Sequence, residues 1–291
     1  MITCGELLVK GTRLLREKEI EASRLEAEVL LAFAWGRSRT DLLIFSNDLV
    51  PGSIEEKFYD ILQQRGCGVP VAYLTGEKEF MSLPFYVNPS VLIPRPETEL
   101  IVEKVLEHFA DREEKGAVGH LAADVGTGSG AVAVSLAYYN PRLRLKAVDI
   151  SARAIQVAAR NARRHEVADR VEFLQGDLLS LLIQRGSTGV GHAVVANLPY
   201  IPTADLHDLP RDVHYEPNSA LDGGEDGLEL YRRLAPQASV FLAPGGLIAC
   251  EVGPDQAEQL ARILSVQGWE EIQIVRDYAG RERIVIGVFG G

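Results

Sequence analysis

The chain has 291 residues, of which 46% are hydrophobic, and a formal net charge of −11. This composition supports a large core and argues against a disordered chain, and the length suggests about two domains. The acidic balance and the absence of any run of lysines and arginines argue against naked DNA or RNA as the main partner, because phosphate contacts supply most nucleic-acid affinity.

Cysteine usage and the N-terminal sequence both indicate a cytoplasmic protein. Cys4, Cys67 and Cys250 are scattered without metal-ligand spacing and are interpreted as thiols in a reducing compartment. The opening MITCGELLVKGTRLL carries Glu6 and Lys10 among its apolar residues, unlike a signal peptide. No apolar stretch approaches the roughly 18 residues of a membrane span. We expect no bound metal, no membrane association and, since no large apolar stripe is evident, a monomer.

Residues 1–76 are expected to form a small helical bundle. In SRLEAEVLLAFAWG the apolar residues follow a 3.6-residue spacing, with Ser23 as the candidate N-cap and Gly36 as the stop. A second helix is expected in IEEKFYDILQQRGCG, ending at Gly66 or Gly68. The segment is not basic and has no catalytic signature, so its expected role is to hold a macromolecular partner.

Residues 77–95 are expected to form a β-hairpin linker, because GEKEFMSLPFYVNPSVLI mixes aromatic and β-branched residues with Gly, Pro, Asn and Ser. The following PRPETELIVEKVLEHF predicts a helix with Pro96 at its first position. Glu97 and Glu99 would then lie at the positive end of the helix dipole, which explains them as well as a site role does. Core packing is expected for the aromatics Phe80, Phe85 and Tyr86.

Residues 96–291 are expected to form an α/β catalytic domain with a mostly parallel sheet. From Leu121 onwards short apolar runs alternate with helical patterns such as SARAIQVAARNARRH and GLELYRRLAPQASVFL, which indicates parallel βαβ units. Only YAGRE separates the last two strands, which is too short for a helical crossover, so these should pair as an antiparallel hairpin at the end of the sheet. The expected strands are LAADV, LKAVDI, VEFLQ, AVVAN, GLIACEV, EIQIVRD and RIVIGVF.

A glycine-rich loop is predicted in ADVGTGSGAVAVSLA, which follows a strand and opens a helix. Gly126, Gly128 and Gly130 allow positive φ and a close approach of the backbone to a ligand. The helix N-terminus behind them offers free N–H groups. The loop also fits a nicotinamide-dinucleotide site.

Two aspartates follow the next two strands. Asp149 closes the second strand, at the spacing of a carboxylate that accepts two ribose hydroxyls. Asp177 follows the third strand and is placed to reach an adenine amino group, with Leu178 against the ring. Either aspartate could instead cap the helix that follows. Together with the glycine loop they indicate an adenosine-bearing cofactor.

The fourth strand ends on the tetrapeptide Asn197-Leu198-Pro199-Tyr200. The Asn197 side-chain oxygen and a neighbouring backbone carbonyl, held by the proline, make two acceptors for an –NH2 group, and Tyr200 can stack on a planar group. Accepting both hydrogens orients a weakly nucleophilic nitrogen and stabilises the positive charge that develops as it attacks an electrophile. The tetrapeptide therefore predicts methylation of a planar nitrogen.

These motifs identify a resemblance over nearly the whole length. The chain resembles the HemK/PrmC protein-(glutamine-N5) methyltransferases, which modify peptide chain release factors in translation termination. The resemblance implies a class I, Rossmann-like S-adenosylmethionine-dependent methyltransferase domain behind an N-terminal substrate-recognition bundle. The matching segments are YLTGEKEFMSLPFYVNPSVLIPRPETELIV, DVGTGSGAVAVSLA, AVDIS, GDLL, NLPYI, YEPNSALDGGEDGL and RDYAGRERIVIG.

The resemblance also implies the cofactor and its site. S-adenosylmethionine would be the methyl donor and S-adenosylhomocysteine the product. Asp149 would accept the ribose hydroxyls, the Asp177–Leu178 pair would hold the adenine, and Asn197 would border the cofactor. The methionine and ribose portion would lie against the glycine loop, which comprises Gly126, Thr127, Gly128, Ser129 and Gly130.

The implied substrate is the glutamine side chain in the Gly-Gly-Gln tripeptide of class I release factors. Asn197 would hold its amide through the side chain, and the Leu198 main-chain carbonyl would be the second acceptor. Pro199 and Tyr200 would complete the pocket. The N-terminal bundle would grip another part of the release factor. The resemblance supplies no role for Glu97, Glu99 or Glu216.

One departure leaves alternatives open. The usual family tetrapeptide is Asn-Pro-Pro-Tyr, whereas Asn-Leu-Pro-Tyr is typical of rRNA adenine dimethyltransferases, so an adenine N6-methyltransferase acting on rRNA or DNA is the alternative. The acidic charge, the N-terminal placement of the helices and IPRPETE favour glutamine. A dehydrogenase gives no role to the tetrapeptide, and intact Asp149 and Asn197 disfavour a non-catalytic scaffold.

Overall fold

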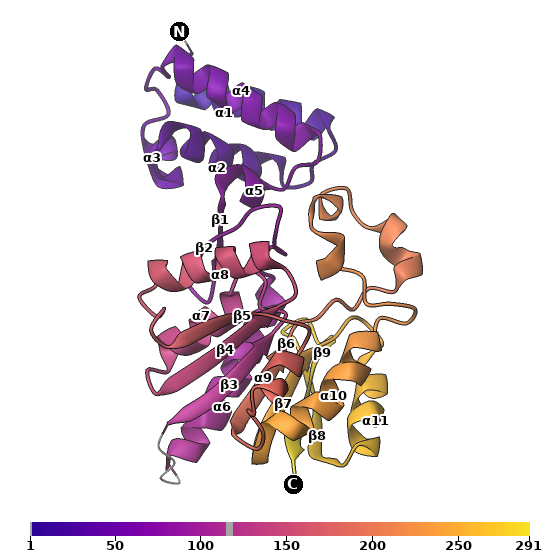
Figure 1. The fold of residues 1–291 in the computed structure, drawn as a ribbon. Helices are drawn as coiled ribbons and strands as arrows, with labels where there is room; N and C mark the ends of the chain where they lie inside the picture. The colour runs from indigo at the N-terminus through magenta and orange to yellow at the C-terminus, as the bar shows by residue number, and fades with distance from the viewer. Residues whose placement is uncertain (1, 115–118) are drawn as a thin grey trace. The chain divides into compact units, whose positions relative to one another are not determined.

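A computed structural model describes residues 2–114 and 119–291; Met1 and residues 115–118, which fall in the predicted ranges 1–76 and 96–291, lie outside the described residues. The chain divides into two compact units (Figure 1). The first combines Met1–Glu77 with Pro210–Tyr215, and the second combines Lys78–Leu209 with Glu216–Gly291.

The first unit is the helical bundle. Leu7, Leu30 and Phe58 belong to its buried core. Capping boxes begin two of its helices, where Thr3 and Ser38 accept backbone N–H groups and Glu6 and Asp41 return the bond. The helices are α1 Cys4–Glu17, α2 Ser23–Trp35, α3 Arg39–Ile44, α4 Gly52–Gly66 and α5 Val71–Thr75.

The ends of two helices test the sequence interpretation. Ser23 is not the N-cap of α2, as predicted, but its first residue; Ala22 holds the cap position without a side-chain hydrogen bond. Ser23 is buried, so its hydroxyl is enclosed by the bundle instead of closing the helix end. Gly36 ends α2 with φ of 70°, and α4 ends at Gly66, both as expected.

A segment distant in sequence completes the first unit. The 3₁₀ turn η3, Val213–Tyr215, follows Arg211. The Tyr215 hydroxyl donates to the Cys67 carbonyl at 3.0 Å, just after α4. A Cβ atom at Gly68 would lie 3.0 Å from the Arg211 side chain, so this segment packs closely on the α4–α5 turn. Cys4, Cys67 and Cys250 are free thiols.

The expected hairpin is present as a separate two-stranded sheet of β1 Glu77–Phe80 and β2 Leu83–Tyr86. Met81 and Ser82 join the strands with φ of 50° and 56°, the conformation of a tight hairpin turn. The Glu99 carboxylate accepts the Met81 N–H at 2.6 Å. Glu99 therefore fastens the hairpin turn to the start of the following helix.

In the described part of the second unit, a seven-stranded sheet has the order β5-β4-β3-β6-β7-β9-β8. Strands β3 to β7 run parallel, and β9 pairs antiparallel with both β7 and β8. The predicted mostly parallel sheet and its antiparallel hairpin are confirmed. The bounds are β3 His120–Val125, β4 Leu143–Asp149, β5 Val171–Gln175, β6 Gly191–Ala196, β7 Leu242–Glu251, β8 Trp269–Arg276 and β9 Glu282–Phe289.

Helices cover both faces of this sheet (Figure 1). Along β6, Ala193 and Val195 belong to one apolar cluster, and Val194 and Ala196 belong to the other, because successive side chains of a strand point to opposite faces. The first face is covered by α6 Glu99–Glu114, α7 Ala131–Tyr139 and α8 Ala152–Arg164. The second is covered by α9 Ser180–Gln184, α10 Glu229–Phe241 and α11 Ala257–Val266.

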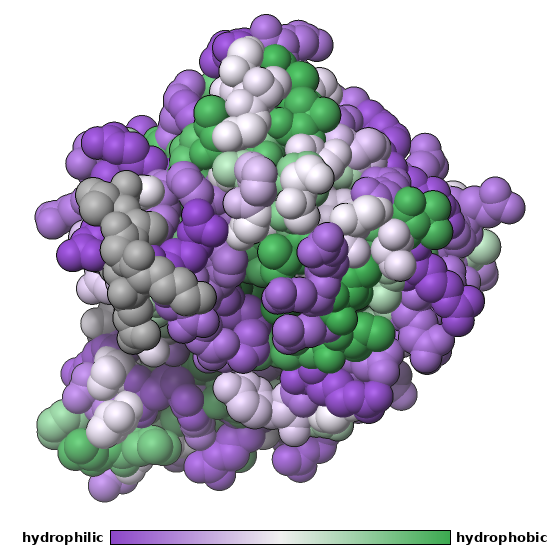
Figure 2. All heavy atoms as spheres, turned by 90° about the horizontal axis from the view of Figure 1, so that it is seen from below, coloured by the Kyte–Doolittle hydropathy of each residue, from purple (hydrophilic) through white to green (hydrophobic). Residues whose placement is uncertain are grey.

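Short 3₁₀ helices lie between these elements. They are η1 Pro96–Thr98, η2 Thr203–Asp208 and η4 Asn218–Ala220. Pro96 is the first residue of η1, and α6 begins only after it, at Glu99. On the face shown in Figure 2, hydrophilic residues border several apolar areas. Within the described ranges, no helix has both the length and the apolar character needed to cross a membrane.

Candidate active site

A cavity of about 320 Å³ lies at the carboxyl ends of β3, β4, β5 and β6. This is where parallel α/β sheets bind ligands. The glycine loop, both predicted aspartates and most of the predicted tetrapeptide meet there. The sequence-predicted residues in its lining are Gly126, Thr127, Gly128, Ser129, Asp149, Asp177, Leu178, Asn197, Leu198 and Pro199.

Two predicted site residues are absent from that described lining, Gly130 and Tyr200. Gly130 has φ of 79°, and a Cβ atom there would lie 2.9 Å from the Ala158 Cβ in α8. Its glycine therefore allows α7 and α8 to approach, as the third glycine of such loops does.

The glycine loop is held from beneath by a carboxylate that the sequence analysis did not single out. Asp124 is 2% exposed and accepts the Thr127 hydroxyl at 2.7 Å and the Ala133 N–H at 3.1 Å. Burial raises the pKa of Asp124 to about 6, although both hydrogen bonds oppose that rise. Asp124 thus ties the loop to the first turn of α7.

Asp149 ends β4 at the cavity wall. One carboxylate oxygen accepts the Gly128 N–H at 2.9 Å, and the other accepts the Ser151 N–H at 2.8 Å. Burial raises the pKa of Asp149, and the two backbone hydrogen bonds lower it. The cap of α8 is Ser151, whose hydroxyl accepts the Ala154 N–H. Asp149 is therefore linked to the glycine loop and lines the cavity, but it does not cap the helix.

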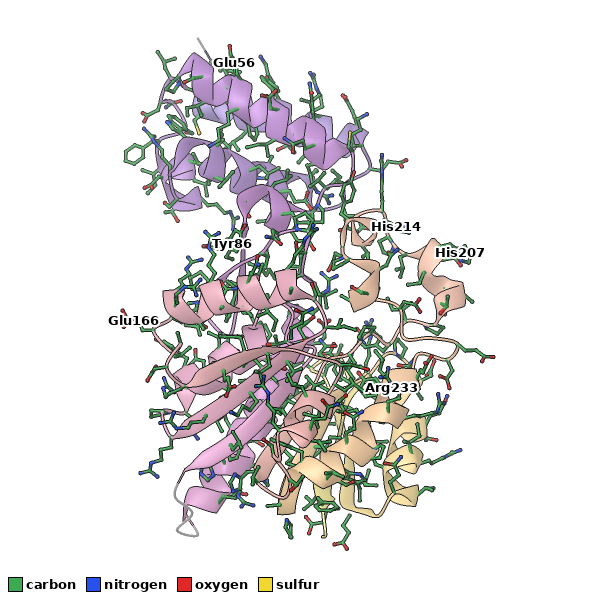
Figure 3. All side chains as sticks on the ribbon, viewed as in Figure 1. Glu56, Tyr86, Glu166, His207, His214 and Arg233 are labelled. Carbon is green, nitrogen blue, oxygen red and sulfur yellow. The ribbon has the colours of Figure 1, made fainter. Side chains whose placement is uncertain are left out.

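Asp177 and Leu178 follow β5, which lies next to β4 in the sheet. The Asp177 carboxylate forms an ion pair with Arg233. Arg233 comes from α10 (Figure 3). Both residues line the cavity, and both side chains are partly exposed to solvent. Leu178 is buried and lines the cavity, and its φ of 50° is uncommon outside glycine.

The Asn197 side chain is oriented by Thr98, a residue of η1 in the second unit. Its Nδ2 donates to the Thr98 hydroxyl at 3.0 Å, and Thr98 is buried in η1. The network therefore assigns Nδ2 to the protein side and leaves Oδ1 as an acceptor for a ligand. This is the acceptor that the sequence predicts for Asn197.

The Leu198 backbone is fixed by Tyr231 of α10. The Leu198 N–H donates to the Tyr231 hydroxyl at 3.2 Å, and this hydroxyl donates to the Glu251 carbonyl in a shorter contact. The Leu198 carbonyl lies 3.3 Å from the same hydroxyl. A hydroxyl has one proton, and a carbonyl has two lone pairs, so the Leu198 carbonyl retains acceptor capacity.

Tyr200 is held by a different set of contacts. Gln256 donates to the Tyr200 carbonyl at 2.8 Å. A Cβ atom at Gly223 would lie 2.8 Å from the Tyr200 Cα, so the LDGGEDGL segment packs directly on the tetrapeptide backbone. Burial raises the pKa of the Tyr200 hydroxyl to about 12, so its ring stays neutral at physiological pH.

The segments IPRPETE and YEPNSALDGGEDGL are remote in sequence and meet at an ion pair between partly exposed Arg95 and buried Glu216. Glu216 accepts the Ile93 N–H at 3.0 Å with one oxygen and pairs with Arg95 through the other. The Glu216 side chain is 2% exposed. The structure thus gives Glu216 the role that the sequence left open, because it joins two segments of the cavity wall.

Five residues that support the cavity were missed or left without a role by sequence reasoning; Glu99, also left without a role, holds the hairpin turn instead. Glu251, the single acid in the apolar strand GLIACEV, was detectable as an anomaly of its strand. Asp124 was detectable as a carboxylate two residues before the glycine loop. The full set is Thr98, Asp124, Glu216, Tyr231 and Glu251.

Comparisons with known proteins agree with this geometry. The PrmC N-terminal domain model matches residues 6–76, and a methyltransferase domain model matches residues 122–215. A release factor glutamine methyltransferase from Moorella thermoacetica is 46% identical over 283 residues, covering 97% of each chain. The chain belongs to the release factor glutamine methyltransferase family. The family predicted from the sequence motifs is thereby confirmed.

A second relative and a more distant solved structure are also similar to this chain. The relative from Clostridium acetobutylicum is 37% identical and covers 98% of each chain. Among solved structures, the hMettl16 catalytic domain in complex with a MAT2A 3'UTR hairpin has a TM-score of 0.59 at 14% identity, covering 80% of this chain and 83% of that one. This likeness confirms the methyltransferase fold.

Proposed function

We propose that this protein transfers a methyl group from S-adenosylmethionine to the side-chain amide nitrogen, N5, of the glutamine in the Gly-Gly-Gln motif of class I peptide chain release factors. The observation that carries the proposal is the orientation of Asn197: its Nδ2 donates to Thr98, which leaves Oδ1 as an acceptor, and Asn197 and Leu198 both line the cavity. A primary amide has two N–H groups, which match these two acceptors.

The cavity residues fit S-adenosylmethionine. The loop at Gly126 and Gly128 exposes backbone without side chains, and a Cβ atom at Gly128 would meet no atom closer than 3.9 Å. The Asp149 carboxylate would take the ribose hydroxyls, and Asp177 with Leu178 would hold the adenine. When bound, S-adenosylmethionine supplies an electrophilic methyl group.

The protein's own part in the reaction is to orient the nucleophile. Amide nitrogens are poor nucleophiles because their lone pair is delocalised into the carbonyl. Asn197 Oδ1 and the Leu198 carbonyl would accept the two N–H groups, hold the nitrogen in line and stabilise the positive charge that it develops. Pro199 restricts the backbone that carries this carbonyl. Neutral Tyr200 would border the site without adding charge.

The helical unit would hold the release factor away from the methylated loop. Its match to the PrmC N-terminal domain model supports a role specific to this family. The α3 region also presents consecutive exposed apolar side chains, Leu43, Ile44 and Phe45, between 47% and 66% exposed. Such residues suit contact with a protein better than contact with nucleic acid. The expected compartment is the cytoplasm, where release factors act.

The test is a methyl-transfer assay with labelled S-adenosylmethionine. A release factor, the same factor with its Gly-Gly-Gln glutamine changed to alanine, and rRNA are offered separately, and the modified residue is located by mass spectrometry. We expect label on the glutamine and none on the alanine variant or the RNA. Label on RNA adenine would favour the adenine N6-methyltransferase alternative, and no label on any of them would refute the proposed reaction.

A further inference from the structure

A buried carboxylate lies behind Asn197, and the reaction described above does not use it. Glu251 ends β7 and is 1% exposed. Its Oε2 atom has no hydrogen-bond partner among the described residues. Burying a carboxylate is costly unless hydrogen bonds or charges compensate. The presence of this carboxylate at the edge of the sheet therefore calls for a functional explanation.

Three side chains from distant parts of the chain form a polar cluster there. The Thr98 hydroxyl and the Asn197 amide lie close enough to the Glu251 carboxylate to lower its pKa. Asn197 Nδ2 also donates to Thr98 Oγ1 at 3.0 Å. Thr98 is 5% exposed, so the cluster is closed to bulk water on that side. Thr98 and Asn197 also line the cavity, so the cluster connects the buried carboxylate to the site.

An ionised carboxylate only accepts hydrogen bonds, whereas an amide group can present either its oxygen or its nitrogen. When Glu251 is ionised, the Thr98 hydroxyl can donate to the carboxylate while it accepts from Asn197. Thr98 and Glu251 then both favour the nitrogen of the Asn197 amide, Nδ2, on their side. We infer that Glu251 is a positioning residue that locks the Asn197 amide with its oxygen toward the substrate; this inference rests on the proposed glutamine methylation. Glu251 does not touch the reacting atoms.

The charged and titratable groups around Glu251 make this lock depend on pH. Arg283 of β9 lowers the pKa of Glu251 and Glu97 of η1 raises it, and burial as the dominant cause brings it to about 7. The hydroxyls of Tyr200 and Tyr231 face it as well, and both stay protonated because burial raises their pKa values. A protonated Glu251 could donate to Thr98, which could then donate to Asn197 Oδ1 and turn the amide over.

The experiment replaces Glu251 and, separately, its two charged neighbours in the full-length protein. We expect Glu251→Gln to lower kcat on the release factor at least tenfold, because a glutamine side chain can stabilise the reversed amide. Its dissociation constant for S-adenosylmethionine should stay within about twofold of the wild type. Glu251→Asp, which keeps an acceptor-only group, should recover part of the loss.

Substitutions of Glu97 and Arg283, the charged neighbours of Glu251, are tested through the pH dependence of kcat. A merely structural role of Glu251 would not shift this pH dependence. In the wild type, kcat should fall on the acid side with an apparent pKa near 7. Glu97→Gln should move this acid limb to lower pH, and Arg283→Gln should move it to higher pH, because these side chains shift Glu251 in opposite directions. The pH profiles of all variants are measured with one release factor preparation, so titration of the substrate affects every profile equally.

The outcomes separate this inference from the proposed function. Wild-type protein that leaves the release factor glutamine unmodified refutes the function, whatever Glu251 does. Active wild-type protein whose Glu251→Gln variant keeps its rate from pH 6 to 9 refutes the positioning role. If Glu251→Gln does not fold, the two neighbour variants decide: shifts of the acid limb in opposite directions support the role, and coincident profiles refute it.

Discussion

A Cβ atom at Gly126 would lie 2.9 Å from Cδ2 of Leu198. The first residue of the glycine loop and the residue that departs from the usual family tetrapeptide are therefore fitted to each other. Leu198 is 4% exposed and packs with the apolar cluster on the α10 face of the sheet. The leucine thus contributes core packing at a position where the usual proline would contribute backbone rigidity.

Gly126→Ala should destabilise the protein and weaken cofactor binding. The substitution places a side chain on a backbone with φ of 76° and against Leu198, which together cost roughly 2–4 kcal/mol. Gly186→Ala is the matched control, because Gly186 has φ of 81° but no atom within 4 Å of an added Cβ. Urea denaturation should show a clearly larger loss for Gly126→Ala, and equal losses would contradict the fit to Leu198.

Asn197→Ala should leave S-adenosylmethionine affinity within a few fold and reduce turnover by about 100-fold or more. The variant loses the oriented acceptor, and removing one such transition-state contact typically costs 10²–10³ in rate. Calorimetry measures cofactor binding, and single-turnover methyl transfer measures the chemical step. Methylation at a near-normal rate would remove the two-acceptor mechanism.

Asp149→Ala should instead affect the binding of S-adenosylmethionine. It removes the acceptor for the Gly128 and Ser151 N–H groups as well as the proposed contact to ribose. We expect the dissociation constant for S-adenosylmethionine to rise at least tenfold, and kcat at saturating cofactor to change less. An unchanged dissociation constant by calorimetry would rule out the ribose role.

Asp124→Asn should flatten the pH dependence of stability. Burial raises the Asp124 pKa from 3.8 to about 6, so its stabilising contribution is complete below pH 3.8 and is lost as pH rises through 6. At about 1.4 kcal/mol per pKa unit, the loss is on the order of 3 kcal/mol. Oδ2 accepts both hydrogen bonds, and an asparagine oxygen can replace it. Relative to wild type, the variant should gain stability between pH 4 and 7, and parallel curves would argue against a buried charge.

Ile44→Lys should weaken the grip on the whole release factor without affecting a short substrate. Ile44 is 66% exposed at the end of α3, so the substitution should cost little stability. Val266→Lys is the control, because Val266 is 88% exposed at the end of α11. KM for the full release factor should rise several-fold only for Ile44→Lys, and KM for a peptide containing Gly-Gly-Gln should change for neither variant.

The strands, the glycine loop and the position of Asn197 at the end of β6 could be predicted from the sequence because each depends on neighbouring residues. A continuous apolar run, Ala193 to Ala196, marks β6, and three glycines between a strand and a helix mark the loop. The short YAGRE connection predicts the β8–β9 pairing for the same reason. Ser23 shows the limit of such local signals, since burial by the bundle overrode its capping preference.

The supporting residues could not be assigned because their partners are remote in sequence. Thr98 and Asn197 are separated by 99 positions, and Arg95 and Glu216 by 121. No periodicity or spacing rule links such pairs. Only the order of strands brings η1 beside the ends of β6 and β7, where Asn197 and Glu251 lie.

The strand order also has a consequence for how the chain is made. Strand β8 precedes β9 in the chain, yet β8 joins the sheet only by pairing with β9, which occupies the place next to β7. During synthesis β8 therefore has no docking edge until β9 has been translated, while the β7 edge stays open to other chains. Such transiently unpaired edges are prone to aggregation. A ribosome that stalls between β8 and β9 would thus hold a nascent chain in its most vulnerable state.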